Sequence, residues 1–167
     1  MASIIAKVIN GVTWLAELLA KIGLVGLLLI VIHEVVVRYV FNSPTLHSVE
    51  LSEYLLVLVV FMSIGWVLKE DRHVAVTFAV DLLPEKVHLV LKTLTSLLTM
   101  TFLGILVWKG GKTAFTAYTG NYHSSSLLNF PMWIPYAFIP LGALVLSLQY
   151  LVKIGELLRS LGKNPNP

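Results

Sequence analysis

The residues most able to do chemistry are an acid and a base inside a long apolar stretch. Glu34 and Arg38 stand four residues apart with the acid first, which is the favourable order for an ion pair along a helix. Ionisable side chains among lipid-soluble residues are costly unless they find partners, so each marks a functional hypothesis. We expect the intrahelical pair. A contact of either side chain with a neighbouring helix, and a proton-carrying role for Glu34, stay open.

The other reactive residue types do not assemble a catalytic or metal centre. The chain has no cysteine, and none of its five histidines has a second histidine at a metal-ligand spacing. A haem would need two axial ligands that face each other, and no phosphate loop, nucleophile elbow or HExxH motif is present. The sequence therefore predicts a protein that is not an enzyme and that carries no catalytic, cofactor, metal or substrate site of its own.

Apolar stretches long enough to lie in lipid must position these residues. Hydrophobic residues make up 57% of the 167, charged residues only 13%, and the mean hydropathy is +0.84. A soluble domain would carry about 25% charged residues, and crossing a hydrocarbon core takes roughly 20 helical residues. The sequence predicts an all-α integral membrane protein with four transmembrane helices, near residues 22–41, 51–68, 93–108 and 127–152.

The flanking segments are expected at the membrane surface. Residues 1–21 have a polar stripe beside an apolar one, which predicts an amphipathic helix that lies in the interface or lengthens the first span. Residues 74–83 are apolar but too short to cross, so they form a short cytoplasmic interfacial segment. We further expect a helix that begins at Pro44, a polar outer loop over residues 113–126, and a C-terminal tail over residues 153–167. Residues 22–152 then form the transmembrane domain.

The basic residues predict the orientation. With four spans, nine of the twelve lie in the two termini and the middle loop, and three lie on the opposite side: Arg38, Lys109 and Lys112. Loops rich in Lys and Arg stay in the cytoplasm, so both termini are expected there. The surplus of 12 basic over 9 acidic residues is small and scattered, which argues against a nucleic-acid partner.

Three stretches of the sequence carry recognisable motifs over roughly residues 31–151. They are Arg38-Tyr39-Val40-Phe41-Asn42-Ser43-Pro44 with Glu50-Leu51 after it, His73-Val74-x-Val76 with Asp81-x-Leu83-Pro84, and Pro131-Met132-Trp133 with Ile139-Pro140-Leu141-Gly142. In this order they resemble the small, Q-type membrane subunit of tripartite ATP-independent periplasmic (TRAP) transporters.

The resemblance implies a supporting role in a multi-pass protein of the bacterial inner membrane. A large multi-span membrane subunit would hold the substrate and sodium sites, and a periplasmic binding protein would deliver an organic acid, such as a C4-dicarboxylate or a sialic acid. This chain, surrounded by lipid, would stabilise the large subunit and hold no cofactor. The residues expected to fix loops or subunit contacts are Glu34, Arg38, Asn42, Glu50, His73, Asp81, Pro131 and Trp133.

Two other readings stay open. A small proton-coupled multidrug exporter also has four spans and a membrane-embedded glutamate in the first, which would be Glu34. Such exporters are usually shorter and lack the cytoplasmic segment between residues 73 and 84. A quinone-linked or haem-linked membrane anchor of an enzyme would need a bound chromophore.

Overall fold

The computed structural model describes residues 2–43, 45–70, 85–126 and 128–162. Within them lie four long helices: α1 (Ala2–Val40), α2 (Leu46–Lys69), α4 (Glu85–Thr119) and α5 (Trp133–Gly162). These residues form no strand, and their one β feature is an isolated bridge between His123 and Pro131. Each helix contains an apolar window long enough to cross a membrane, so the predicted all-α membrane fold is confirmed. The expected interfacial segment of residues 74–83 lies outside the described residues.

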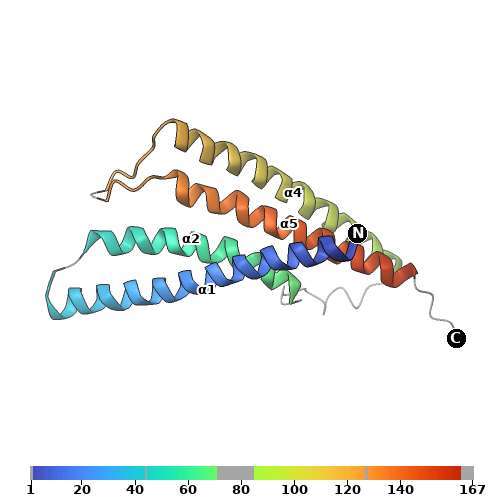
Figure 1. Ribbon diagram of the computed structural model, residues 1–167, viewed down its shortest axis with the longest axis horizontal. Coiled ribbons are helices and arrows are strands. Elements are labelled where there is room, and N and C mark those ends of the chain that lie inside the picture. The colour runs from blue at the N-terminus through green and yellow to red at the C-terminus, as the bar shows by residue number, and fades with distance from the viewer. Residues whose placement is uncertain (1, 44, 71–84, 127, 163–167) are drawn as a thin grey trace.

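The helices form a thin layer (Figure 1): at the end of the helical connections their order is α1, α2, α5 and α4, whereas toward the other end α1 crosses α2 and lies against α5. The start of α1 at Ala2 and the end of α5 at Gly162 lie at one end of this layer, which we call the terminus end. The links from α1 to α2 and from α4 to α5 lie at the other, the connection end, where the two helical hairpins splay apart. The first half of α1 also reaches α5.

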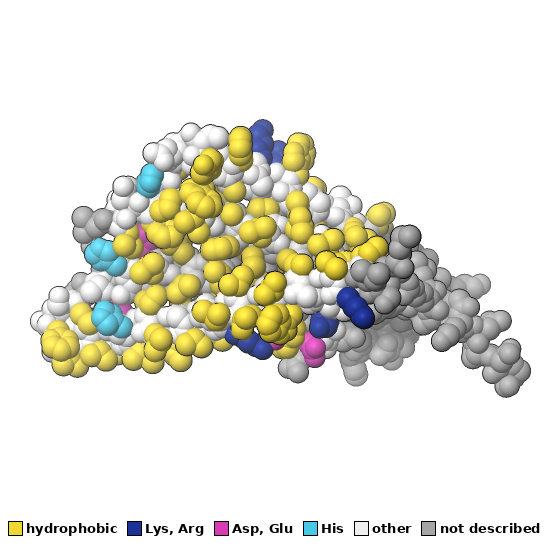
Figure 2. All heavy atoms as spheres, in the orientation of Figure 1, with side chains coloured by type: hydrophobic (Ala, Val, Ile, Leu, Met, Phe, Trp, Pro, Cys, Tyr) yellow, Lys and Arg dark blue, Asp and Glu magenta, His cyan; other side chains and the backbone are white. Residues whose placement is uncertain are grey.

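A single layer leaves most apolar side chains uncovered. Figure 2 shows hydrophobic side chains spread over the visible face rather than hidden within it. The buried share of each apolar window is at most 28%, in α5, and falls to 6% in α4. Water would penalise such a surface heavily, whereas lipid or another membrane protein would cover it at little cost.

Small residues bring α2 close to α5. A Cβ added to Gly142 of α5 would collide with the backbone carbonyl of Phe61 in α2, and one on Gly65 would lie 2.8 Å from Val145. Lipid tails are as apolar as leucine and do not drive helices together, so close backbone approach supplies much of the packing energy. We call these contacts, together with those of α1 on α5 described below, the central seam.

The N-terminal segment continues the first span without a break, because α1 runs unbroken from Ala2 to Val40. Of the two arrangements left open for residues 1–21, the structure has the long continuous helix. Its packed stripe was not anticipated, because the side chains of the expected apolar stripe are exposed: Ile5, Val8, Val12, Leu15 and Leu19. The buried residues recur at helical spacing and are Ile9, Thr13, Ala16 and Ala20.

Several predicted boundaries were wrong. The third helix begins at Glu85 rather than residue 93, and α5 continues to Gly162, past the predicted end at residue 152. The third helix continues to Thr119, so residues 113–119 are not part of a loop. The last helix begins at Trp133 rather than residue 127, and α2 begins at Leu46 rather than Pro44. The physical reason is a missing signal: residues 113–152 carry no Asp, Glu, Lys or Arg to mark a water-facing loop. Pro135 sits in the first turn of α5, where a helix needs no backbone donor.

Candidate functional site

Every described residue of the predicted set lies at the connection end. Glu34 and Arg38 lie in the last turns of α1, Asn42 lies in the link that follows, and Glu50 lies in the first turns of α2. Pro131 and Trp133 stand where the link from α4 enters α5. The two remaining predicted residues, His73 and Asp81, lie outside the described residues.

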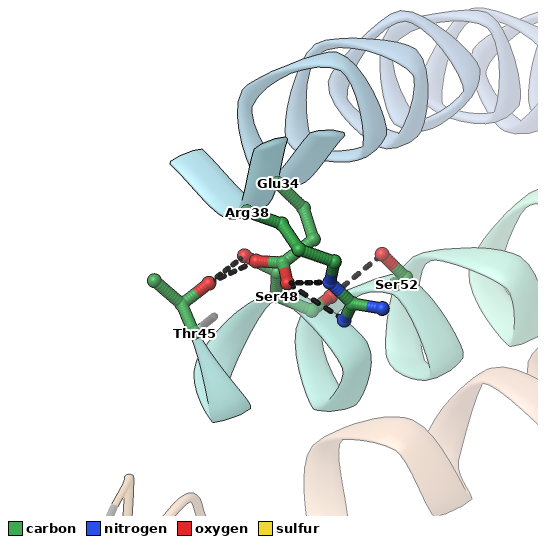
Figure 3. A network of polar contacts seen from close by, with 5 residues as sticks. All are labelled: Glu34, Arg38, Thr45, Ser48 and Ser52. Carbon is green, nitrogen blue, oxygen red and sulfur yellow. Dashed lines mark hydrogen bonds and ion pairs between the residues drawn. The ribbon is translucent and has the colours of Figure 1, made fainter. Parts of the chain in front are cut away.

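The first polar group is the Glu34 cluster, formed by Glu34, Arg38, Thr45 and Ser48 (Figure 3). The Arg38 guanidinium donates from Nη2 and Nε to Oε1 of Glu34, at 2.9 and 3.2 Å. The other carboxylate oxygen of Glu34 accepts a hydrogen bond from the Thr45 hydroxyl, which also lies 2.7 Å from Oγ of Ser48. The predicted intrahelical pair is therefore present, and the same carboxylate also ties α1 to the start of α2.

The chain reverses direction at Asn42, which adopts a left-handed backbone with φ 51°. Asparagine tolerates this conformation better than most residues. Just after it, the Ser43 N–H donates a hydrogen bond to the Val37 carbonyl at 3.3 Å. This carbonyl belongs to the last turn of α1, where the helix itself supplies too few donors. Thr45 is the N-cap residue of α2 but makes no side-chain cap bond, because its hydroxyl is engaged by the Glu34 cluster.

The second group is the Glu50 cluster, formed by Glu50, Tyr54, Ser124 and Ser126. Glu50 accepts hydrogen bonds from the Tyr54 hydroxyl, at 2.5 Å, and from the Ser126 hydroxyl. Ser126 Oγ lies 3.0 Å from Oγ of Ser124, which in turn accepts from the Phe130 N–H at 3.1 Å. One carboxylate in α2 thus holds the link between α4 and α5.

Aromatic contacts complete the attachment of this link. The Tyr54 ring stacks on Phe130 with 4.9 Å between ring centroids. Trp133, the first residue of α5, meets Tyr118 of α4 edge to face at 5.8 Å. Pro131 pairs with His123 in the isolated bridge. Both predicted residues of this segment therefore fix the entry into α5.

A third polar contact was missed from the sequence. Thr13 of α1 is fully buried and donates to Gln149 of α5 at 3.2 Å, or to the Ile9 carbonyl at 3.0 Å. The Gln149 amide nitrogen lies 3.4 Å from Oδ1 of Asn10. A usable signal existed, because Gln149 is the one amide side chain in the apolar stretch of residues 133–152.

Nothing in these arrangements resembles a catalytic centre. The buried polar side chains among the described residues are Thr13, Ser48 and Gln149, none of which is ionisable. Two hollows open at the connection end: one of about 840 Å³ between α2 and the link into α5, and one of about 480 Å³ between α1 and α2. In the described parts of the chain, no three His, Asp or Glu side chains gather where a metal ion could bind. The polar clusters of the connection end hold helix ends and links in place.

Sequence comparison identifies the family. Residues 27–160 match the model described as the DctQ component of tripartite ATP-independent periplasmic transporters. The chain belongs to this family. It is a small membrane subunit of a TRAP transporter, as the three sequence stretches predicted, and its relatives are transporter subunits rather than enzymes.

Two small permease proteins are similar to this chain over most of their own length. The ectoine TRAP transporter small permease protein TeaB of Halomonas elongata is 26% identical over 142 residues, which cover 83% of this chain and 73% of TeaB. The sialic acid TRAP transporter small permease protein SiaQ of Vibrio cholerae is 26% identical over 160 residues, which cover 93% of this chain and 86% of SiaQ.

A third relative is a larger protein. The sialic acid TRAP transporter permease protein SiaT of Haemophilus influenzae is 31% identical over 84 residues. The match covers 50% of this chain but only 14% of SiaT. In SiaT, therefore, a segment similar to half of this DctQ component is part of a much longer permease chain.

Proposed function

We propose that this chain is the static supporting subunit of a sodium-coupled TRAP importer for an organic acid. It stabilises a large membrane subunit, which holds the substrate and sodium sites and performs the transport movement. The observation that carries the proposal is the single layer of helices: apolar on its exposed surface, and without a buried ionisable side chain among the described residues. Such a layer offers a broad surface to a partner but no enclosed path for a polar solute.

The SiaT match supports a large membrane partner. Since a segment similar to this chain occurs within one long permease chain, a small subunit and a large permease can work side by side in the membrane.

We also propose that a periplasmic binding protein delivers the solute. The names of the two small relatives mention ectoine and sialic acid, and both are 26% identical to this chain. Identity therefore does not select the solute, and we keep the broader class of organic acids.

We propose the bacterial inner membrane as the location, with both termini in the cytoplasm. Charge supports this orientation: the sequence places nine basic residues in the terminal segments and the middle loop, whereas the other three, Arg38, Lys109 and Lys112, lie in the parts of α1 and α4 nearer the connection end. The connection end, with the Glu34 and Glu50 clusters, then faces the periplasm, where a binding protein would approach.

Reconstitution in proteoliposomes tests this function. The chain, its large membrane subunit and the binding protein are combined, and uptake of labelled organic acids is measured with and without an inward sodium gradient. We expect uptake only with all components and with sodium, and loss of uptake when this chain is omitted. Uptake by the large subunit and binding protein alone would contradict the supporting role.

The same vesicles separate the exporter alternative. In the structure the Glu34 carboxylate already accepts hydrogen bonds from Arg38 and Thr45, which favours a structural role over proton carriage. We expect vesicles that contain only this chain to show no proton flux coupled to a cationic drug. Such a flux, abolished in Glu34→Gln, would replace the proposal with the exporter reading.

A further inference from the structure

Two lysines face away from the rest of the layer. Leu103 and Ala117 of α4 are buried, with 3% and 1% of their surface exposed, on the side of α4 that packs on α5. At about 100° of rotation per residue, Lys112 lies about 180° around the helix from Leu103, and Lys109 about 60° further. Both lysines are exposed, and Figure 2 shows basic side chains along the α4 edge of the layer.

Within the described ranges, neither lysine pairs with an acid. Two ion pairs occur among the described residues, Lys21 with Glu17 and Arg38 with Glu34, and both lie elsewhere. The Lys109 ammonium lies 5.2 Å from the centroid of the neighbouring Trp108 ring, which covers one side of it. The lysines therefore present positive charge outward from the edge of the layer.

Their depth makes this exposure unusual. A Cβ on Gly110 would lie 3.1 Å from the ring of Pro140, so Lys109 is level with Pro140. Pro140 stands seven residues inside the apolar span Trp133–Ile154 of α5, which is about 10 Å at 1.5 Å per residue. Lys112 is one turn nearer the connection end. The sequence had placed both lysines beyond the third span, whereas the structure places them within a helix and beside apolar residues.

An ammonium at this depth is costly in lipid unless it meets an opposite charge, a polar cavity or the headgroup layer. On α1, by contrast, the exposed basic side chains of Lys21 and Arg38 are each paired with an acid one turn earlier, Glu17 and Glu34. The exposed residues of α1 at comparable depth include Leu28 and Ile32, at 58% and 51% exposure, which suit lipid tails. Correspondingly, the apolar window of α1 has a mean hydropathy of 2.4 and that of α4 only 1.3.

We propose that the outer face of α4 is the docking surface for the large membrane subunit, and that a helix of that subunit places one or two carboxylates opposite Lys109 and Lys112. The inference rests on the proposed function, which supplies the partner. Charge complementarity selects the occupant, because neither lipid tails nor a second copy of this lysine-bearing face neutralises the two ammonium groups. The α1 edge then faces the bilayer.

Copurification of the intact complex tests the charge requirement. The chain is coexpressed with its large membrane subunit, and the amount of large subunit recovered with it is measured. We expect K109E/K112E to reduce recovery at least fivefold, because it turns attraction into repulsion. K109M/K112M should reduce it less, since it leaves the partner's carboxylates unpaired. Lys7→Glu, an exposed charge reversal near the terminus end of α1, is the matched control and should leave recovery unchanged.

Site-specific crosslinking tests the position even where a charge variant fails to assemble. Because the chain has no cysteine, single cysteines carry a photoreactive maleimide cleanly. We expect crosslinks to the large subunit from Ile105→Cys and Thr116→Cys on the lysine face, and lipid adducts from Leu28→Cys and Ile32→Cys on α1.

The outcomes separate the two proposals. Unchanged recovery of both lysine variants, with lipid adducts from Ile105→Cys and Thr116→Cys, would overturn the α4 surface and mean that the lysines reach the headgroups. Crosslinks to the large subunit from α1 alone would also overturn it. A wild-type chain that brings down no large subunit would instead overturn the proposed function itself.

Discussion

The central seam and the connection end are held together by different interactions. In the seam, Gly142 and Gly65 let α5 and α2 approach until backbone meets backbone, and one buried hydrogen-bonded contact joins Thr13 to Gln149. At the connection end, the carboxylates of Glu34 and Glu50 accept hydrogen bonds from hydroxyl groups on other segments of the chain. Ser126, for example, bonds to Glu50 across 76 positions.

This difference follows from the solvent on each part of the molecule. In lipid the hydrophobic effect does not draw apolar helices together, so small residues that permit close packing determine the contacts. Where the helices end, backbone groups lose their intrahelical partners and the links need side-chain hydrogen bonds to hold a fixed course. The seam should therefore control whether the chain folds, and the clusters should control local order.

The largest expected effect comes from filling the seam. Gly142→Leu places a side chain against the Phe61 carbonyl, and neither backbone can move without separating α2 from α5. We expect a loss of about 3 kcal/mol of stability, because overpacking against backbone is not relieved by a rotamer change. Thermal unfolding in detergent measures it. Gly104→Leu is the matched control, since nothing lies within 4 Å of a Cβ there. Equal melting temperatures for the two variants would contradict the tight seam.

A smaller effect is expected from the buried polar contact. Thr13→Val keeps the shape but leaves the Gln149 carbonyl oxygen without the Thr13 donor, and we expect it to cost about 1 kcal/mol. The double variant T13V/Q149L should cost less, because it also removes the buried Gln149 carbonyl oxygen, and only the half-buried Asn10 then loses a partner. Thr101→Val, at an exposed position of α4, serves as the control. A double variant that is less stable than Thr13→Val would contradict this account.

Glu50→Gln should change the link more than the fold. It replaces one carboxylate oxygen by a donor that faces Tyr54 or Ser126, so residues 120–132 lose an anchor. We expect hydrogen exchange in this segment to become several-fold faster while the melting temperature stays near that of the wild type. Glu53→Gln, one turn away and exposed, should leave exchange unchanged. Unaltered exchange in Glu50→Gln would mean that the aromatic contacts hold the link by themselves.

The smallest effect is expected from Arg38→Ala. Half of the Arg38 side chain is exposed, and Thr45 still donates to Glu34 when the guanidinium is gone. Exposed pairs of this kind contribute little to stability. We therefore expect a nearly unchanged melting temperature and, since α1 lies at the opposite edge from α4, nearly unchanged recovery of the large subunit. A large loss of recovery would move the docking surface toward α1.

Much of the candidate site could be predicted because its signals are local. The spacing of Glu34 and Arg38 predicted their ion pair, and both the family pattern and the link sequence pointed to Asn42, Glu50 and Trp133. Their partners were not predictable. Thr45, Ser124 and Ser126 are ordinary loop residues in sequence, and only the fold brings Ser126 to Glu50.

The sequence by itself determined that this chain lies in lipid, that it forms four long helices and that it belongs to the TRAP small subunits. Hydropathy and motifs carry this information because both depend only on residues that are neighbours in the sequence. Only the tertiary structure decided which faces meet. In α1 the exposed stripe is aliphatic, while Ile9, Thr13, Ala16 and Ala20 pack inward. The physical reason is that lipid accepts apolar side chains as readily as a protein interior does, so close fit and hydrogen bonding to a distant helix select the buried face.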